Sequence, residues 1–233
     1  MKATVLIPAA GTGRRMGGSV NKQYLELAGK PILAHTLTLF ENHPQVENIY
    51  VIVPIDDIAY CQKNIIDRFK FNKVQRIIAG GVERQDSVRN GLNAITEDGF
   101  NQQCRPILIH DGARPLFDCK RLSALIEAVE ESGACTVGVP VKDTIKDVEN
   151  KTITGSPDRS RLWQAQTPQG FQYHLIMEAF DRADADGFVA TDDASLVERL
   201  GHPVQMLEGD YRNIKVTTPE DILVAVALLG GRT

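Results

Sequence analysis

A glycine-rich, cation-bearing segment near the N-terminus most constrains how this chain can fold. Residues 8–22 read Pro-Ala-Ala-Gly-Thr-Gly-Arg-Arg-Met-Gly-Gly-Ser-Val-Asn-Lys and directly follow the apolar run 4–7. A glycine-rich turn at the end of a first strand is where α/β proteins hold phosphate groups. This turn carries Arg14, Arg15 and Lys22, which is more positive charge than a dinucleotide-binding loop needs. The segment therefore predicts an α/β fold that binds a polyphosphate.

Strand-like and helix-like patterns alternate along most of the chain. We expect strands over 4–8, 48–53, 74–79, 106–110, 134–140 and 204–207. Helical spacing predicts helices over 31–40, 84–95, 118–131, 173–182 and 192–200. Two further helices are expected: one that is capped by Asp56 or Asp57 and runs to about Phe69, and a last one that begins at Thr218 and Pro219. Strands joined by right-handed helical crossovers form parallel sheets. The prediction is a single Rossmann-like α/β domain over 1–233, with a mostly parallel twisted sheet and helices on both faces.

The alternation stops between residues 141 and 170. This stretch is rich in Thr, Asp, Ser and Pro and shows no helical pattern. About thirty residues without a helix are unusual inside a compact domain, so the stretch is expected to have its own role. We expect a projecting β-arm that clasps a partner subunit in a homodimer. A disordered linker is the alternative, but Leu162, Trp163 and Phe171 are too apolar for it.

Composition narrows the class of partner. The formal net charge of −4 argues against binding to nucleic acid or to an anionic membrane surface. No apolar run approaches the roughly 20 residues that span a bilayer. The four cysteines form no CxxC pair, which favours reduced thiols. With no signal-peptide pattern at the start, we expect a cytoplasmic protein.

Polar clusters follow four of the expected strands, at 9–22, 80–87, 110–115 and 141–144. In a doubly wound sheet, ligands bind outside the carboxyl ends of the strands. We therefore expect these clusters to converge in space on one site.

The first cluster fails the tests for two common phosphate loops. A G-x-G-x-x-G fingerprint needs glycine where Met16 stands, and the Gly-Lys-Ser/Thr of a Walker A motif is missing. The pattern G-x-G-x-R-M, with a lysine six residues after the methionine, is more specific. Its small residues let backbone N–H groups approach a triphosphate, while Arg15 and Lys22 neutralise it. A glycine turn with solvated cations is the alternative. The expected phosphate cradle comprises Pro8, Ala9, Ala10, Gly11 and Gly13.

Many short blocks along nearly the whole chain resemble one family. They include Pro8-Ala9-Ala10-Gly11, Arg14-Arg15-Met16, Lys22-Gln23-Tyr24, Gly80-Gly81, Asp86-Ser87-Val88, His110-Asp111, Ala113-Arg114-Pro115, Asp143-Thr144, Thr167-Pro168-Gln169, Thr191-Asp192 and Asn213-Ile214-Lys215-Val216-Thr217. The pattern is similar to nucleotidyltransferases of the sugar-nucleotide pyrophosphorylase superfamily. Within that superfamily it resembles the 2-C-methyl-D-erythritol 4-phosphate cytidylyltransferases of the non-mevalonate isoprenoid pathway.

The resemblance implies a reaction between CTP and methylerythritol 4-phosphate that releases pyrophosphate. The substrate phosphate attacks the α-phosphorus in line with the leaving group, so the enzyme must position two anions and stabilise developing charge. By resemblance, Arg15 and Lys22 are the catalytic residues. The resemblance also favours Asp111 as a ligand for Mg²⁺ over a simple turn aspartate. A phosphate monoester needs no general base at neutral pH, so His110 is expected to be structural.

The resemblance also assigns binding residues. The nucleotide side comprises Gly80, Gly81, Arg84, Ser87 and Asp111, although Ser87 alone would be an ordinary helix-start serine. The family pattern has an acidic residue at position 82, where this chain has Val82, which puts a side-chain contact to the base in doubt. The side of the second substrate comprises Arg114, Thr144, Arg159, Thr191 and Lys215. Arg159 lies in the expected arm and would serve the neighbouring subunit's site. Without the resemblance, Arg159 would be interpreted as a solvated loop arginine, and Lys215 would be interpreted as a lysine on an edge strand.

Two alternative functions stay open on the sequence. Ribitol 5-phosphate cytidylyltransferase, or another sugar-phosphate nucleotidyltransferase, has the same build. The second alternative is not an enzyme but a non-catalytic regulator that binds a nucleotide on the same fold. The presence of Arg15, Lys22 and Asp111 argues against this alternative.

Overall fold

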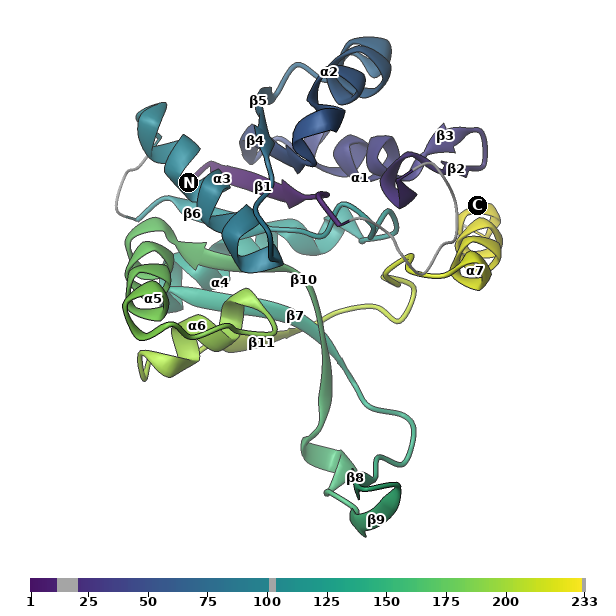
Figure 1. The fold of residues 1–233 in the computed structure, drawn as a ribbon, viewed down its shortest axis with the longest axis vertical. Coiled ribbons are helices and arrows are strands. Elements are labelled where there is room, and N and C mark those ends of the chain that lie inside the picture. Colours follow the sequence, from purple (N-terminus) through teal and green to yellow (C-terminus); the bar gives the residue numbers. More distant parts are fainter. Residues whose placement is uncertain (12–20, 101–103, 232–233) are drawn as a thin grey trace.

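The computed structural model describes residues 1–11, 21–100 and 104–231, which form a layered α/β structure with one long projection (Figure 1). The strands are β1 Ala3–Pro8, β2 Glu26–Leu27, β3 Lys30–Pro31, β4 Val46–Val53, β5 Val74–Ala79, β6 Pro106–Ile109, β7 Ala134–Pro140, β8 Asp147–Glu149, β9 Thr152–Gly155, β10 Trp163–Gln172 and β11 Gln205–Glu208. The α-helices are α1 Ile32–Glu41, α2 Ile58–Cys61, α3 Arg84–Glu97, α4 Leu122–Ser132, α5 Tyr173–Asp186, α6 Asp193–Arg199 and α7 Pro219–Gly230. Short helical turns are η2 Lys22–Tyr24, η3 Ile55–Asp57, η4 Gln62–Asp67, η5 Cys119–Arg121 and η6 Arg159–Arg161.

Seven strands form the main sheet in the order β11-β7-β10-β6-β1-β4-β5. Strand β1 lies inside the sheet and pairs in parallel with both β4 and β6. Its residues Ala3 to Ile7 are fully buried, as expected of a parallel strand covered on both faces. The sequence prediction of an α/β fold with a mostly parallel sheet is confirmed.

Helices cover both faces of this sheet, and each face has its own core. On one face, Leu33 and Phe40 of α1 and Leu125 of α4 pack with the side chains of β1 and β4. On the other face, Val88 of α3 and Phe180 of α5 lie among the remaining strand residues. The predicted covering of both faces is therefore confirmed. Within the described chain, no helix is long and apolar enough to cross a membrane.

Strand β10 departs from the sequence prediction. Residues 163–170 were expected to belong to the arm, but β10 enters the main sheet and pairs antiparallel with both β6 and β7. The chain leaves the sheet at the end of β7, runs through the projection and returns in the opposite direction. A Cβ on Gly170 would lie 2.6 Å from Cγ2 of Val129, so glycine lets α4 pack closely over this strand. The first residues of β10, 163–165, are exposed and run along the projection, whereas residues 166–171 are buried in the sheet (Figure 1).

The projection is the predicted β-arm. Strands β8 and β9 pair antiparallel at its tip, far from the helices in Figure 1. Val148 and Ile153 on these strands are 55% and 61% exposed, so the arm presents apolar side chains to its surroundings.

Several local predictions can be compared with the structure. Thr218 caps α7 in a capping box with Asp221, with Pro219 as the first helical residue, as predicted. Pro31 is the N-cap of α1 and not its first residue. Asp57 is the N-cap residue of α2, one of the two predicted positions, but its side chain makes no capping bond and instead accepts a hydrogen bond from Asn21.

Candidate active site

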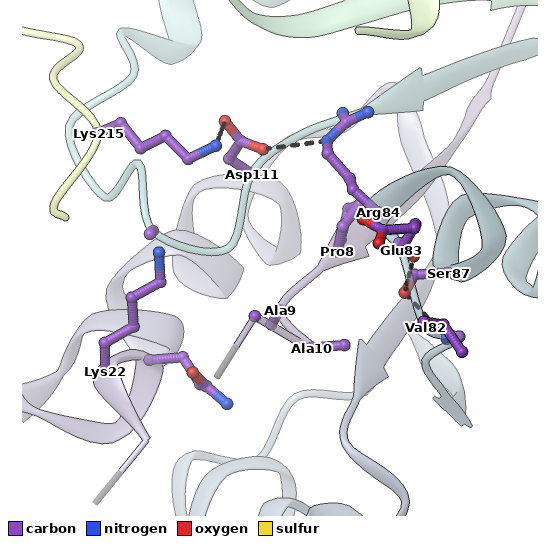
Figure 2. A pocket seen from close by; sticks show the side chains of 14 residues that line it. Pro8, Ala9, Ala10, Lys22, Val82, Glu83, Arg84, Ser87, Asp111 and Lys215 are labelled. Carbon is purple, nitrogen blue, oxygen red and sulfur yellow. Dashed lines mark hydrogen bonds and ion pairs between the residues drawn. The ribbon is translucent and has the colours of Figure 1, made fainter. Parts of the chain in front are cut away.

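A pocket of about 580 Å³ opens at the carboxyl ends of β1, β5 and β6 (Figure 2). Three of the four predicted polar clusters meet there, because these strands end at the same edge of the sheet. The cluster at 141–144 is absent from the described lining, since the chain after β7 turns into the arm. The lining residues are Pro8, Ala9, Ala10, Gly11, Lys22, Gln23, Gly81, Val82, Glu83, Arg84, Ser87, Asp111, Ala113 and Lys215.

The floor of the pocket is built from residues without bulky side chains. The backbone N–H of Ala9 donates to Ile52 at 2.7 Å, which extends the β1–β4 pairing to the pocket. A Cβ on Gly80 would lie 2.3 Å from that of Ala10, and one on Gly112 would lie 2.9 Å from that of Ala9. Close packing of these turns therefore requires glycine at both positions. Gly80 itself supports the floor from behind and does not line it.

Lys22 lies on η2 and forms one side of the pocket. Figure 2 shows its side chain extending beside the floor formed by Ala9 and Ala10, on the side opposite Arg84. Its Cε would be 3.9 Å from a Cβ on Gly11, so the ammonium stem runs along the turn that follows β1. The other predicted catalytic residue, Arg15, and the predicted cradle residue Gly13 lie outside the described residues.

Asp111 follows β6 and is the centre of a charged cluster. Its Oδ2 is 3.0 Å from Nζ of Lys215 and 3.2 Å from Nε of Arg114, and its Oδ1 is 3.8 Å from Nε of Arg84. Burial alone would raise the pKa of the Asp111 carboxyl, but the three cations together hold it well below its usual range. Asp111 is therefore a carboxylate at physiological pH.

Arg84 is held in place from the helix across the pocket. Its guanidinium makes two hydrogen bonds to the buried carboxylate of Asp193, at 2.9 and 2.6 Å. Such a paired contact fixes the plane of the guanidinium. Asp193 lies at the start of α6, 109 residues away in the sequence. Sequence reasoning missed Asp193, because only the fold brings the two residues together.

Ser87 orders the turn at Gly80 and Gly81. Its Oγ accepts a hydrogen bond from the Gly81 N–H at 3.0 Å and donates to the Glu83 carbonyl at 3.1 Å. Its hydrogen is thereby used locally, which leaves the hydroxyl oxygen available to ligands as an acceptor. Val82 beside it is 94% exposed and stands at the pocket edge.

Lys215 reaches Asp111 because the segment around it is tied to the turn after β6. Val216 N–H donates to the Ala113 carbonyl at 2.8 Å, and Arg114 donates to the Asn213 carbonyl at 2.7 Å. The described chain over 213–216 forms no strand, so Lys215 is not an edge lysine. Lys215 and Arg114 also line a neighbouring cavity of about 230 Å³, which extends the site toward Gln166.

His110 is structural, as predicted from the sequence. It is fully buried, and burial lowers its pKa to about 4. Its Nε2 donates to the Arg114 carbonyl at 3.0 Å, and its Nδ1 lies 3.0 Å from the hydroxyl of Thr167. That hydroxyl accepts the Asp111 N–H at 3.1 Å. Thr167, for which sequence reasoning gave no role, therefore holds the backbone of Asp111.

Of the residues predicted to bind the second substrate, three line neither the pocket nor the neighbouring cavity. Thr144 and Arg159 lie exposed on the arm, where Arg159 donates to the Lys142 carbonyl at 2.6 Å. Thr191 is exposed next to Asp192, the N-cap of α6. Thr191 lies two residues before Asp193, the partner of Arg84, whereas the other two residues lie on the projection.

The described residues include no group of three or more His, Cys, Asp or Glu side chains that could hold a metal ion. Asp111 is the carboxylate that the sequence singled out. Among the described residues, its Oδ1 has only the long contact to Arg84, whereas Lys215 and Arg114 lie closer to Oδ2. Mg²⁺ is commonly held by one or two carboxylates together with substrate phosphates. The donor set fits an ion that arrives with a triphosphate.

Comparison with known proteins gives a consistent result over the full length. The family model described as 2-C-methyl-D-erythritol 4-phosphate cytidylyltransferase matches residues 3–231. A protein of that description from Geotalea uraniireducens is 52% identical over 229 residues, which cover 98% of this chain and 97% of the relative. One from Geobacter metallireducens is 50% identical over 98% of both chains. The crystal structure of the Francisella tularensis protein of that description superposes with a TM-score of 0.83 at 30% identity, covering 98% of this chain and all of the other.

Proposed function

Because the chain belongs to the 2-C-methyl-D-erythritol 4-phosphate cytidylyltransferase family of the non-mevalonate isoprenoid pathway, we propose how its described residues perform the transfer. The chain is a nucleotidyltransferase whose substrates are CTP and methylerythritol 4-phosphate. One observation carries the assignment of roles. A floor of small residues lies between Lys22 on one side and Arg84 on the other, with Asp111 and Lys215 above it in Figure 2. A triphosphate on that floor meets cations from both directions.

The reaction demands positioning and charge stabilisation more than proton transfer. The substrate phosphate is already an anion, and its oxygen forms a bond to the α-phosphorus while the bond to pyrophosphate breaks. Negative charge then concentrates on the equatorial oxygens of the α-phosphorus and on the leaving group. We assign the stabilisation of this charge to Lys22, together with Arg15. The buried, neutral His110 takes no part in the step.

The second substrate is assigned to the side of the pocket that Lys215 and Arg114 border. Both cations are anchored on Asp111, so their charged ends stay near the pocket in the absence of ligand. The two fixed cations attract the phosphate group of this substrate. This arrangement suits a polyol phosphate. The neighbouring cavity toward Gln166 provides room for its carbon chain.

We assign to the carboxylate of Asp111 the role of holding a Mg²⁺ ion that would arrive with the triphosphate. When bound, the ion neutralises phosphate charge and orients the triphosphate. The protein's own contribution is to keep Asp111 ionised and in place through Lys215, Arg114 and Thr167.

The arm residues Thr144 and Arg159 are assigned to the site of a partner subunit in a homodimer. Two observations support this assignment. Both residues lie outside the pocket of their own chain, and the arm carries the exposed apolar side chains of Val148 and Ile153. We also propose a cytoplasmic location, in keeping with the four free cysteines.

A pyrophosphate-release assay tests the proposed function. It crosses CTP, UTP and ATP with methylerythritol 4-phosphate and ribitol 5-phosphate, each with Mg²⁺ and with chelator. We expect rapid release only with CTP, methylerythritol 4-phosphate and Mg²⁺ together. Equal rates with ribitol 5-phosphate would contradict the substrate, equal rates with UTP would contradict base selectivity, and undiminished release in chelator would contradict the metal.

A further inference from the structure

The carboxylate of Asp57 makes a contact that its place in the sequence does not suggest. It ends η3, the turn after β4, where the pattern predicts a helix cap. Its Oδ2 instead accepts a hydrogen bond from Nδ2 of Asn21 at 2.6 Å and lies 3.5 Å from Nε2 of Gln23. Asp57 is thus bonded to the residues on both sides of Lys22 and lies outside the pocket lining.

The bond to Asn21 fixes the start of the turn that carries Lys22. The Asn21 carbonyl accepts the Tyr24 N–H at 2.9 Å, and the Lys22 carbonyl accepts the Leu25 N–H at 3.2 Å. These bonds make η2 a single closed unit. Within this segment the side chains of Gln23 and Tyr24 are buried, whereas those of Asn21 and Lys22 are partly exposed. The contacts with Asp57 therefore restrain the chain immediately before and after Lys22.

We propose that Asp57 is a positioning residue for Lys22. The proposal rests on the role of Lys22 in the proposed function. A hydrogen bond to a carboxylate is about twice as strong as one between neutral groups, so the Asn21–Asp57 bond is well suited to hold η2. Displacing a group that must meet the transition state by about 1 Å can cost about a hundredfold in rate. Asp57 would thus act on the reaction without touching either substrate.

The adjacent Asp56 provides a matched control. It lies on the same turn, carries the same charge and is exposed. A general effect of negative charge near a polyanion would therefore appear at both positions. An effect transmitted through Asn21 would appear only at Asp57.

The experiment measures kcat and KM for Asp57→Ala, Asp57→Asn, Asp56→Ala, Lys22→Ala and the double variant Lys22→Ala/Asp57→Ala, using the full-length protein with CTP and methylerythritol 4-phosphate. Asp57→Ala is expected to lower kcat at least tenfold with KM for methylerythritol 4-phosphate changed less than twofold. Asp56→Ala should stay within twofold of the parent. Asp57→Asn retains an oxygen that accepts from Asn21, so it should recover most of the lost rate.

The double variant separates positioning from a purely structural role. Because Asp57 acts through Lys22, removing it when Lys22 is already absent should change kcat less than twofold. A tenfold loss in both backgrounds would overturn the proposal, as would a normal kcat in Asp57→Ala or an equal loss in Asp57→Asn. Near-normal turnover in Lys22→Ala would instead overturn the proposed role of Lys22, so the two failures are distinguishable.

Discussion

At the scale of single residues, the site depends on three cations held around the carboxylate of Asp111, and on Lys22, which lines another part of the pocket. Lys22, Asp111 and Lys215 were all named from the sequence, because each stands in a short motif that the family resemblance covers. Asp193, Thr167 and Asp57 were not given their roles, because each acts through a contact between distant parts of the chain. The partner of Arg84 lies 109 positions away, and that of Asn21 lies 36 positions away. Such partners depend on the strand order, which the sequence pattern does not reveal.

Replacing Lys22 with alanine should lower kcat by two to three orders of magnitude while leaving the fold intact. Loss of a donor that stabilises transition-state charge costs about 3–4 kcal/mol of activation free energy. Steady-state pyrophosphate release measures the change. Lys63→Ala removes an exposed cation from η4 and serves as the control, with an unchanged rate expected. A Lys22→Ala enzyme within threefold of the parent would contradict the assignment.

His110 should make the free energy of unfolding depend on pH in a defined window. Burial lowers its pKa from 6.5 to about 4. Between these values the unfolded chain binds a proton that the folded chain does not, so the free energy of unfolding falls as the pH drops from 6.5 to 4. Below about 4 both states are protonated, and this contribution changes no further.

Urea unfolding at pH 7.5, 5.5 and 4.5 measures this dependence. His110→Asn should reduce the slope between pH 6.5 and 4. It should not abolish the slope, because burial also lowers the pKa values of His35 and His43. The same slope in the variant and the parent would show that His110 is not the buried neutral base described above.

At the scale of elements, the alternating pattern located the parallel strands and the helices between them well. Strands β5 and β7 begin and end at the predicted residues, because glycine or proline marks their boundaries: Gly80 follows β5, Gly133 precedes β7 and Pro140 ends it. The sequence instead places residues 163–170 of β10 in the arm, because the stretch 141–170 is rich in Thr, Asp, Ser and Pro and shows no regular pattern. Gln169 is buried nevertheless, since its amide bonds Asp192 and the first N–H groups of α6. Polar strand residues with such distant partners give no periodic signal.

The close packing of turns beneath the pocket gives a prediction about Gly80. In Gly80→Ala the added Cβ would start 2.3 Å from that of Ala10, so one of the two turns must move. We expect a loss of about 1–3 kcal/mol in the free energy of unfolding and a raised KM for CTP. Urea unfolding and steady-state kinetics measure the two effects.

Gly230→Ala is the control for this variant. A Cβ there would meet no described atom within 4 Å, and the residue ends α7. It should leave KM unchanged and should not lower stability. If both glycine variants behave alike, the close approach at Gly80 does not shape the pocket.

At the scale of the whole molecule, the arm separates two predicted binding residues from the rest of the site. If Arg159 serves the partner's pocket, a dimer of two different inactive variants contains one complete site. Mixing Arg159→Ala with Lys22→Ala protein should therefore restore up to about a quarter of the parent activity, the share of sites that random exchange completes. The recovery should follow subunit exchange, measured by native mass spectrometry.

The apolar side chains at the arm tip provide the control for this experiment. Val148→Asp/Ile153→Asp should lower the dimer fraction in sedimentation, and should prevent recovery when placed in both inactive variants. Leu223→Asp on α7 replaces a side chain that is 73% exposed and should leave the dimer intact. Exchange of subunits without any recovery of activity would show that Arg159 acts within its own chain or not at all.

The position of β10 between β6 and β7 also bears on how the protein is made. Neither flanking strand pairs with the other in the finished sheet, so the place between them stays empty until β10 enters it. During synthesis on the ribosome, β6 and β7 emerge before the arm, whereas β10, which pairs with both of them, emerges after the arm. The first 162 residues therefore contain two apolar strands with open edges, which are sites for misassociation of nascent chains. We therefore expect the arm to delay closure of the sheet during synthesis, so that chains arrested before residue 172 are far more sensitive to protease than chains arrested after α5.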